Sequence, residues 1–120
     1  MQRIMLKSKI HRATLTATEL DYEGSISIDT ELLRAASMVP GEQVHVLNLN
    51  TGGRLITYII EAPANSGTIM LNGPAARLGQ PGDKVIVITY CNVDEREVAA
   101  FKPTVVIVDA NNRIASLKNA

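Results

Sequence analysis

Short runs of alternating apolar and polar residues, separated by turn residues, fill most of this chain. The alternation has a period of two, as in β-strands, whose successive side chains point to opposite faces. Clusters of Gly, Pro, Asn and Asp separate the runs and mark turns. The chain is therefore expected to be mainly β. The pattern predicts one or two strands over 3–18 and further strands over 26–28, 44–49, 54–61, 68–71, 84–90, 104–108 and 113–117.

Two or three short helices are predicted between these strands. Asp29 has the side chain of a helix N-cap, and the residues after it predict a helix over 30–36. Pro74 fits the first turn of a second helix, over 72–77, because a missing N–H costs nothing there. A third helical turn, over 94–101, precedes a proline. The strand pairs within 44–61 and 104–117 are expected to form hairpins.

Two parts of the chain have similar sequence patterns, an internal similarity that is called the echo below. Residues 35–46 and 75–87 both read as a short helix, Pro-Gly, an acidic residue and then Val-x-Val. Two similar copies predict two interleaved halves that close one small barrel, since a solenoid needs at least about three repeats. Closure would also remove exposed strand edges. Chance similarity is the alternative, because Pro-Gly turns are frequent.

The amino-acid composition limits the size of the domain and the classes of partner that this chain can bind. With 120 residues the chain can form a single domain, over 1–120, with a modest aliphatic core. Twelve Lys and Arg balance twelve Asp and Glu, and aromatic residues make up 3%, which argues against nucleic acid or a membrane surface as partner. No apolar run is long enough to span a membrane, the N-terminus is broken by charges, and the single Cys91 fits a reducing cytoplasm. No metal site is expected, since His11 and His45 are far apart in sequence and no Cys/His cluster exists.

The Gly24–Ser25 peptide is the candidate for chemistry. It follows a strand-like run that ends at Tyr22 and precedes the run 26–28. Glycine permits unusual backbone angles, and a strained Gly-Ser peptide can be attacked by the serine hydroxyl itself. On these residues alone, a tight turn with an ordinary serine is the stronger interpretation.

A set of segments changes that balance, because together they resemble the pyruvoyl-dependent aspartate α-decarboxylases. The segments are 9–13, 20–25, 53–58, 72–76, 81–83 and 102–103. They occur in the family's order and spacing, and none is specific by itself. The resemblance implies a small closed double-psi β-barrel, in agreement with the two-half echo. It also implies a homotetramer with active sites between subunits.

The resemblance further implies decarboxylation of L-aspartate to β-alanine and carbon dioxide, for pantothenate and coenzyme A biosynthesis. Ser25 would attack the Gly24 carbonyl and cut the chain into a β chain, 1–24, and an α chain, 25–120. The cofactor would be a covalently bound pyruvoyl group derived from Ser25, which forms a Schiff base with the substrate amine. An accessory maturation factor for this self-cleavage is possible.

Other positions take roles by the same resemblance. Lys9 and Arg54 match cations that hold the two substrate carboxylates, and Tyr58 matches the proton donor. Thr57 matches a residue that contacts substrate and supports processing near Gly24. The polar wall of the pocket is matched by Asn72, Gly73, Pro74 and Ala75.

Two features fit the family pattern less well. The family usually has alanine where this chain has Pro74. Either a backbone N–H contact to substrate is lost there, or the proline only stiffens the loop. In a regular strand, Arg54 and Tyr58 face one side and Thr57 faces the other. All three can line one site only if the strand is distorted or the site lies between subunits.

Two other functions compete with aspartate decarboxylation. A non-catalytic double-psi barrel could serve as a binding module, but it would have no reason to keep Lys9, Ser25, Arg54 and Tyr58 together. A decarboxylase of another amino acid is the second. Arg54 and Lys9 favour a dicarboxylate over it, because a substrate with one carboxylate would leave a cation unpaired.

Overall fold

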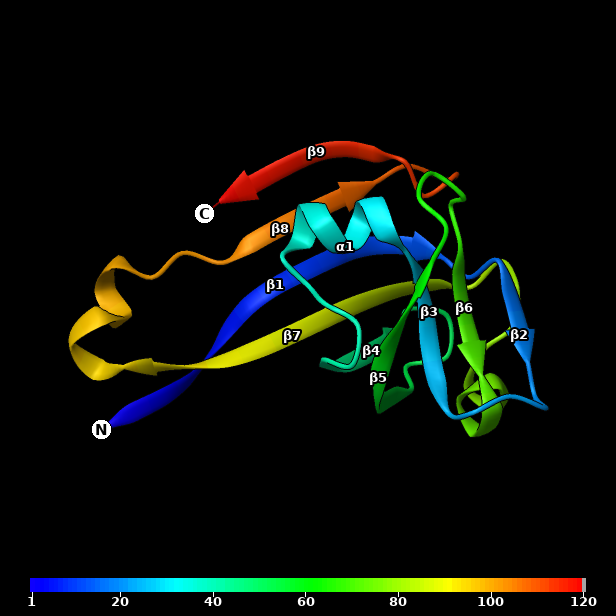
Figure 1. Ribbon diagram of the computed structural model, residues 1–120, viewed down its shortest axis with the longest axis horizontal. Helices are drawn as coiled ribbons and strands as arrows, with labels where there is room; N and C mark the ends of the chain where they lie inside the picture. Colours follow the sequence, from blue (N-terminus) through cyan, green and yellow to red (C-terminus); the bar gives the residue numbers. More distant parts are fainter. Residues whose placement is uncertain (120) are drawn as a thin grey trace.

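The computed structural model describes residues 1–119 and shows a chain built mainly from β-strands (Figure 1). The strands are β1 (Gln2–Thr14), β2 (Ala17–Glu19), β3 (Ser25–Asp29), β4 (Gln43–Asn48), β5 (Arg54–Ala62), β6 (Ile69–Asn72), β7 (Lys84–Asp94), β8 (Thr104–Val108) and β9 (Ile114–Asn119). The helices in this part of the chain are α1 (Thr30–Ala36) and two 3₁₀-helices, η1 (Gly73–Leu78) and η2 (Glu95–Ala100). None of these helices has both the length and the apolar character needed to cross a bilayer. The prediction of a mainly β chain with two or three short helices is confirmed.

All the strands belong to one sheet, in the order β2-β6-β3-β5-β4-β7-β1-β8-β9. β1 and β7 run side by side as long curved strands across the molecule (Figure 1). Three neighbouring pairs are parallel, namely β1–β8, β2–β6 and β3–β5, and the others are antiparallel. Parallel neighbours need crossover connections, so this sheet brings together segments that are far apart in sequence. Closure of the sheet into a double-psi barrel, and the division into one domain of two chains, remain predictions.

The two echoed segments meet in the middle of the sheet. β4 and β7 are antiparallel neighbours, and Val46 pairs with Val87. The helices that precede them differ, because α1 is an α-helix whereas η1 is a 3₁₀-helix with a proline in its first turn. The predicted hairpins are confirmed by the antiparallel pairs β4–β5 and β8–β9. The strand predicted over 84–90 continues to Asp94.

The core is aliphatic and lies between the inner faces of the strands and α1. Every second residue of β4 and of the first part of β7 is buried, as the alternation predicts. All five residues of β3 are buried, so this short strand lies wholly inside the protein. The largest fully buried side chains are Ile10, Leu15, Ile26, Ile28, Leu32, Ile59, Ile69, Leu71, Val44, Val46, Val85 and Val87.

Asp29 caps α1, as predicted, and also holds a distant turn. Its Oδ1 accepts hydrogen bonds from the backbone N–H of Glu31 at 2.8 Å and of Asn65 at 3.0 Å. Its Oδ2 accepts one from Gly67 at 2.8 Å. The carboxylate is 2% exposed, and three donors satisfy it. One side chain therefore fixes the start of α1 and the turn before β6.

Asn112, in the β8–β9 turn, secures the end of β1. Its Oδ1 accepts from the N–H of Thr14 at 2.7 Å, and its Nδ2 donates to the carbonyl of Thr14 at 2.8 Å. The same Nδ2 donates to the carbonyl of Gly67 at 2.8 Å. Asn112 has a φ of 58°, a left-handed conformation that asparagine tolerates better than most residues. The last turn of the chain is thereby joined to the first strand.

Candidate functional site

The Gly24–Ser25 peptide lies where an exposed loop enters the buried sheet. Residues 20–23 are exposed, whereas Ser25 is the first residue of β3 and has no exposed surface. The Ser25 hydroxyl donates to the backbone carbonyl of Glu23 at 3.1 Å. It also accepts a hydrogen bond from Nδ2 of Asn72 at 3.0 Å. These two bonds fix the hydroxyl oxygen next to the peptide bond that precedes it.

Asn72 is the inner partner of this serine. The residue ends β6, pairs in register with Ser25, and has no exposed surface. Its Nδ2 donates to Ser27 Oγ at 2.9 Å as well as to Ser25 Oγ. Its Oδ1 is buried and has no hydrogen-bond partner among the described residues. A buried carbonyl without a donor costs about 1–3 kcal/mol, so such a group is explained most simply by a ligand that satisfies it.

β5 brings Thr57 and Tyr58 beside this peptide. β3 and β5 are parallel and Ile26 pairs with Ile59, so the residues one step earlier, Ser25 and Tyr58, are neighbours across the pair. Thr57 is half-buried and lines a cavity of about 290 Å³. The cavity wall consists of Gly24, Leu55, Ile56, Thr57, Pro74, Ala75 and Leu78. The cleavage site and the residues after β6 therefore border one space.

Tyr58 lies on the other side of β5. Its phenol is 37% exposed and donates to the Glu23 carboxylate over 3.4 Å, a long hydrogen bond. Partial desolvation of the phenol, together with the negative charge of Glu23, raises the pKa of Tyr58. Both effects disfavour the phenolate, so the side chain keeps its proton at neutral pH.

The strand that carries these residues is regular. Arg54, Ile56 and Tyr58 are exposed, and the residues between them are half-buried. The β4–β5 register runs without a shift from Leu47–Arg54 to Gln43–Tyr58. Ile56 of one face and Thr57 of the other nevertheless both line the cavity at Gly24, so residues of both faces of β5 border one space without any shift in register.

Arg54 and Lys9 lie apart from Ser25 in this chain. The Arg54 guanidinium is 3.2 Å from Nδ1 of His45, whose ring stacks edge-on against Tyr90 with centroids 5.1 Å apart. His45 and Tyr90 border a second cavity of about 420 Å³. Lys9 lies on β1, and β5, β4 and β7 separate β1 from β3 in the sheet. Ser25, Thr57, Tyr58 and the segment 72–75 are thus brought together by one chain, whereas the two cations are not.

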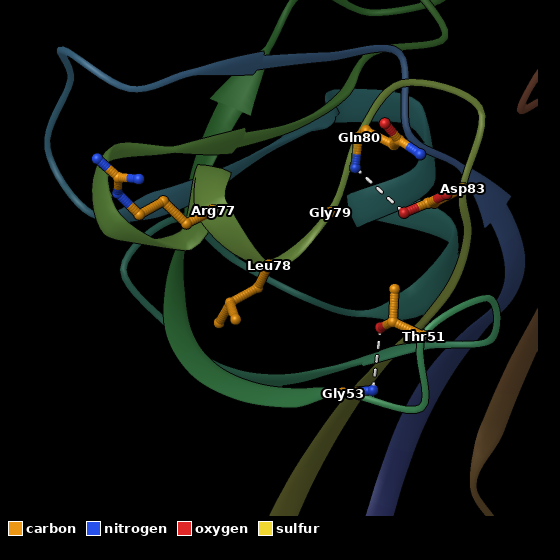
Figure 2. Close-up of a pocket in the computed structure, with 7 residues that line it drawn as sticks. All are labelled: Thr51, Gly53, Arg77, Leu78, Gly79, Gln80 and Asp83. Atoms are coloured by element: carbon orange, nitrogen blue, oxygen red, sulfur yellow. Dashed lines mark hydrogen bonds between the residues drawn. The ribbon is translucent and has the colours of Figure 1, made fainter.

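A third cavity, of about 330 Å³, lies at the end of η1 and the turn that follows it (Figure 2). Its lining residues are Thr51, Gly53, Arg77, Leu78, Gly79, Gln80 and Asp83. Leu78 borders both this cavity and the one at Gly24. Asp83 is buried, and its Oδ2 accepts from the N–H of Gln80 at 3.1 Å (Figure 2) and from Nδ2 of Asn48 at 2.9 Å. The polar contacts here join turns to one another and hold the end of η1.

Two residues of this region were not singled out by the sequence. Glu23 contributes a backbone carbonyl to Ser25 and a carboxylate to Tyr58, and Ser27 shares the Asn72 amide with Ser25. An acidic loop residue is normally solvated, so its type alone gives no signal. Ser27 has the same strand parity as Ser25, and a polar residue at that parity in a buried strand was the available sign.

Comparisons with known proteins agree over nearly the whole chain. A family model described as aspartate decarboxylase matches residues 1–115. A protein of Dehalococcoides mccartyi named aspartate 1-decarboxylase is 56% identical over 115 residues, which cover 96% of this chain and 93% of that protein. One of Myxococcus xanthus with the same name is 57% identical over 114 residues, covering 95% and 88%. Aspartate 1-decarboxylase 1 of Gloeobacter violaceus is 56% identical over 116 residues, covering 97% and 98%.

Proposed function

The chain belongs to the aspartate decarboxylase family, and from that premise we propose that it converts L-aspartate to β-alanine and carbon dioxide after cutting itself between Gly24 and Ser25. One observation carries the proposal. The Ser25 hydroxyl is buried and held by Glu23 and Asn72 beside the peptide it would attack. An ordinary turn serine would be solvated and would not need two fixed partners.

Self-cleavage balances without any other reactant than water. Ser25 Oγ bonds to the Gly24 carbonyl carbon, the C–N bond breaks, and the hydroxyl proton passes to the nitrogen, which leaves an ester. Loss of the Ser25 α-proton then expels the Gly24 carboxylate and leaves a dehydroalanine with a free amino group. Water replaces that nitrogen, ammonia leaves, and a pyruvoyl group remains at position 25. Holding Oγ next to the carbonyl supplies the proximity that the first step needs.

The residues around position 25 suit such a group. When present, a pyruvoyl carbonyl binds a substrate through its amine and withdraws the electrons left by a departing carboxylate. Asn72 offers an amide donor there and a buried oxygen that lacks a partner in the described chain. Thr57, Gly73, Pro74 and Ala75 would form the wall toward the substrate.

Tyr58 would donate the proton that replaces the lost carboxylate. A general acid has to hold its proton until it is needed, and the raised pKa of Tyr58 keeps the phenol protonated. Its hydrogen bond to Glu23 is long and exposed, so the phenol is free to turn toward a substrate.

Lys9 and Arg54 would complete the site across a subunit interface. Lys9 and Arg54 lie apart from Ser25 in one chain, so a site between subunits would bring them to the same substrate. A homotetramer, in which a neighbouring subunit contributes residues, satisfies this requirement. Aspartate has two carboxylates, and an Arg fork and a Lys point charge would bind one each. We place the enzyme in the cytoplasm, where the half-buried thiol of Cys91 stays reduced, and allow for an accessory factor that speeds cleavage.

Mass spectrometry under denaturing conditions tests the proposal. The parent protein should give two chains, 1–24 and 25–120, and the larger should be lighter by one ammonia than a chain that begins with an unmodified serine. Ser25→Ala should give one uncut chain without β-alanine production, and Ser116→Ala, an exposed serine of β9, should behave like the parent. A parent chain that stays intact after prolonged warming, with and without cell extract, refutes self-cleavage. Decarboxylation by the Ser25→Ala variant refutes the role of Ser25.

A further inference from the structure

We propose that Gly73 and Pro74 form a rigid shelf that positions Gly24 for attack by Ser25, and that Pro74 sets the rate of self-cleavage through this contact. The inference rests on the proposed self-cleavage and adds a positioning residue to it. It assigns a role to Pro74, which lines the same cavity as Gly24. The shelf, meaning residues 73 and 74, is the first turn of η1.

Gly73 lets the loop before Ser25 lie directly on the shelf. A Cβ at position 73 would be 2.5 Å from the carbonyl oxygen of Tyr22, 2.8 Å from the nitrogen of Gly24 and 2.9 Å from its Cα. Real Cβ atoms do not approach backbone so closely. Gly73 also has a φ of +62°, where side chains are strained. The backbone of the cleavage loop and the backbone of η1 are therefore in direct contact.

Pro74 limits where Gly24 can go. An ideal Cβ built on Gly24 would lie 3.3 Å from Pro74 Cδ and 4.0 Å from its Cγ. A side chain at residue 24 would thus be crowded by the proline ring, which would have to shift slightly to admit it. Glycine has more conformational freedom than any other residue, and a rigid ring against it removes part of that freedom. An alanine at position 74 would lack Cγ and Cδ and would direct an N–H toward the loop.

The shelf is held at both ends, whereas the loop on it is largely exposed and its hydrogen bonds to the body of the protein come from Ser25 and Tyr58 to Glu23. Before the shelf, Asn72 is bonded to Ser25 and Ser27. At the far end of η1, Asn48 Nδ2 donates to the carbonyl of Leu78 at 3.3 Å and to Asp83. The Gln80–Asp83 hydrogen bond in Figure 2 secures the residues that follow. In the loop, by contrast, Leu20 and Tyr22 are 49% and 52% exposed.

The contact acts on the step that forms the ester. Attack requires the Gly24 carbonyl carbon to stay near Ser25 Oγ, and small misplacements lower the rate of such a step strongly. Asn72 fixes the oxygen, and the shelf fixes the residue that carries the carbonyl. Pro74 packs against Gly24 and takes no part in bond making or proton transfer, so it is a positioning residue.

The test measures cleavage rates of newly made chains. Cell-free synthesis with a labelled pulse gives uncut precursor, and gel electrophoresis or mass spectrometry follows the appearance of residues 1–24 and 25–120. Pro74→Ala should cleave about five-fold more slowly than the parent, the size expected from losing the ring's carbon contacts. Pro81→Ala removes another exposed proline, in the turn before β7, and should cleave at the parent rate. Both variants should show a similar small decrease in unfolding midpoint, because both make the unfolded chain more flexible.

A double-mutant cycle separates positioning from a general loss of stability. Gly24→Ala adds the Cβ that the proline ring crowds, so it should slow cleavage of the parent. In the Pro74→Ala background that penalty should shrink by about three-fold or more. Equal penalties in both backgrounds, or an unchanged rate for Pro74→Ala in a parent that does cleave, overturn the shelf and leave the proposed function intact. Equal slowing by Pro81→Ala overturns it as well. A parent that never cleaves refutes both the proposed function and the shelf.

Discussion

Replacing Tyr58 by Phe should lower turnover strongly without affecting self-cleavage. The substitution removes one oxygen and keeps the ring. That oxygen makes a single, long hydrogen bond of 3.4 Å to Glu23 from a phenol that is 37% exposed, so its loss should change the folding free energy very little. We therefore expect Tyr58→Phe to fold and to cleave at the parent rate.

Catalysis should respond very differently. If the phenol is the proton donor, its removal should lower turnover by about 10²- to 10⁴-fold, which corresponds to about 3–5 kcal/mol in the activation free energy. The loss of one long, exposed hydrogen bond does not account for a change of this size. A loss of this size in a fully cleaved protein would locate the effect in the reaction and not in the fold.

The neighbouring residue supplies the control. Thr57→Val keeps the shape and the β-branching but removes a hydroxyl in the cavity that Gly24 also lines. It should leave uncut chain, because Thr57 is expected to support processing. One mass spectrum and one β-alanine assay on each variant measure both outcomes. If Tyr58→Phe stays uncut, or is cut and fully active, Tyr58 is not the proton donor.

Two further predictions concern charge. Arg54→Ala should raise KM for aspartate about ten- to hundred-fold, since a charge-assisted hydrogen bond is worth about 1.5–3 kcal/mol. The control Arg96→Ala, on η2, should leave KM unchanged. Equal turnover of glutamate and aspartate by the parent protein would refute the selection of substrate by Arg54. Burial and the positive charges of Lys9 and Arg12 lower the pKa of His11, so the unfolded chain binds this proton more readily than the folded one. The stabilisation from neutral His11 is therefore complete above the unfolded pKa of about 6.5 and is lost as the pH falls below it, toward the folded pKa. The unfolding midpoint should fall over this range in the parent and fall less in His11→Asn, and parallel curves for the two proteins would contradict the assignment.

Local features of the fold could be predicted from the sequence because local chemistry determines them. Period-two alternation gave the strands, and the cap at Asp29 and the proline at position 74 gave the starts of two helices. The second and third bonds of the Asp29 carboxylate, to Asn65 and Gly67, could not be predicted, because they join segments that meet only in the folded chain.

The site was less accessible to the same reasoning. The Gly24–Ser25 peptide drew attention by its place between two strand-like runs, and the family resemblance made the chemical interpretation the stronger one. The parallel β3–β5 register that sets Ser25 beside Tyr58 is a non-local pairing with no local signal. The Asn72 amide that serves two serines is hidden for the same reason. Lys9 and Arg54 were expected in one site with Ser25, and this single chain does not join them to it. Residues that a second subunit contributes to a site leave no sign in the apolar and polar alternation of a single strand.

The position of β1 in the sheet gives self-cleavage a consequence for refolding. β1 lies between β7 and β8, and Asn112 makes two hydrogen bonds to the backbone of its last residue, Thr14. The short fragment that ends at Gly24 therefore supplies an interior strand of the sheet. In the uncut chain this strand is tethered, at an effective concentration of about millimolar. Once the tether is cut, assembly becomes a reaction between two molecules, and its yield depends on how much of each is present. If the chain is cut as proposed, only the uncut precursor would fold as a single molecule. A mature protein that unfolds in dilute solution would separate from a strand that its sheet requires.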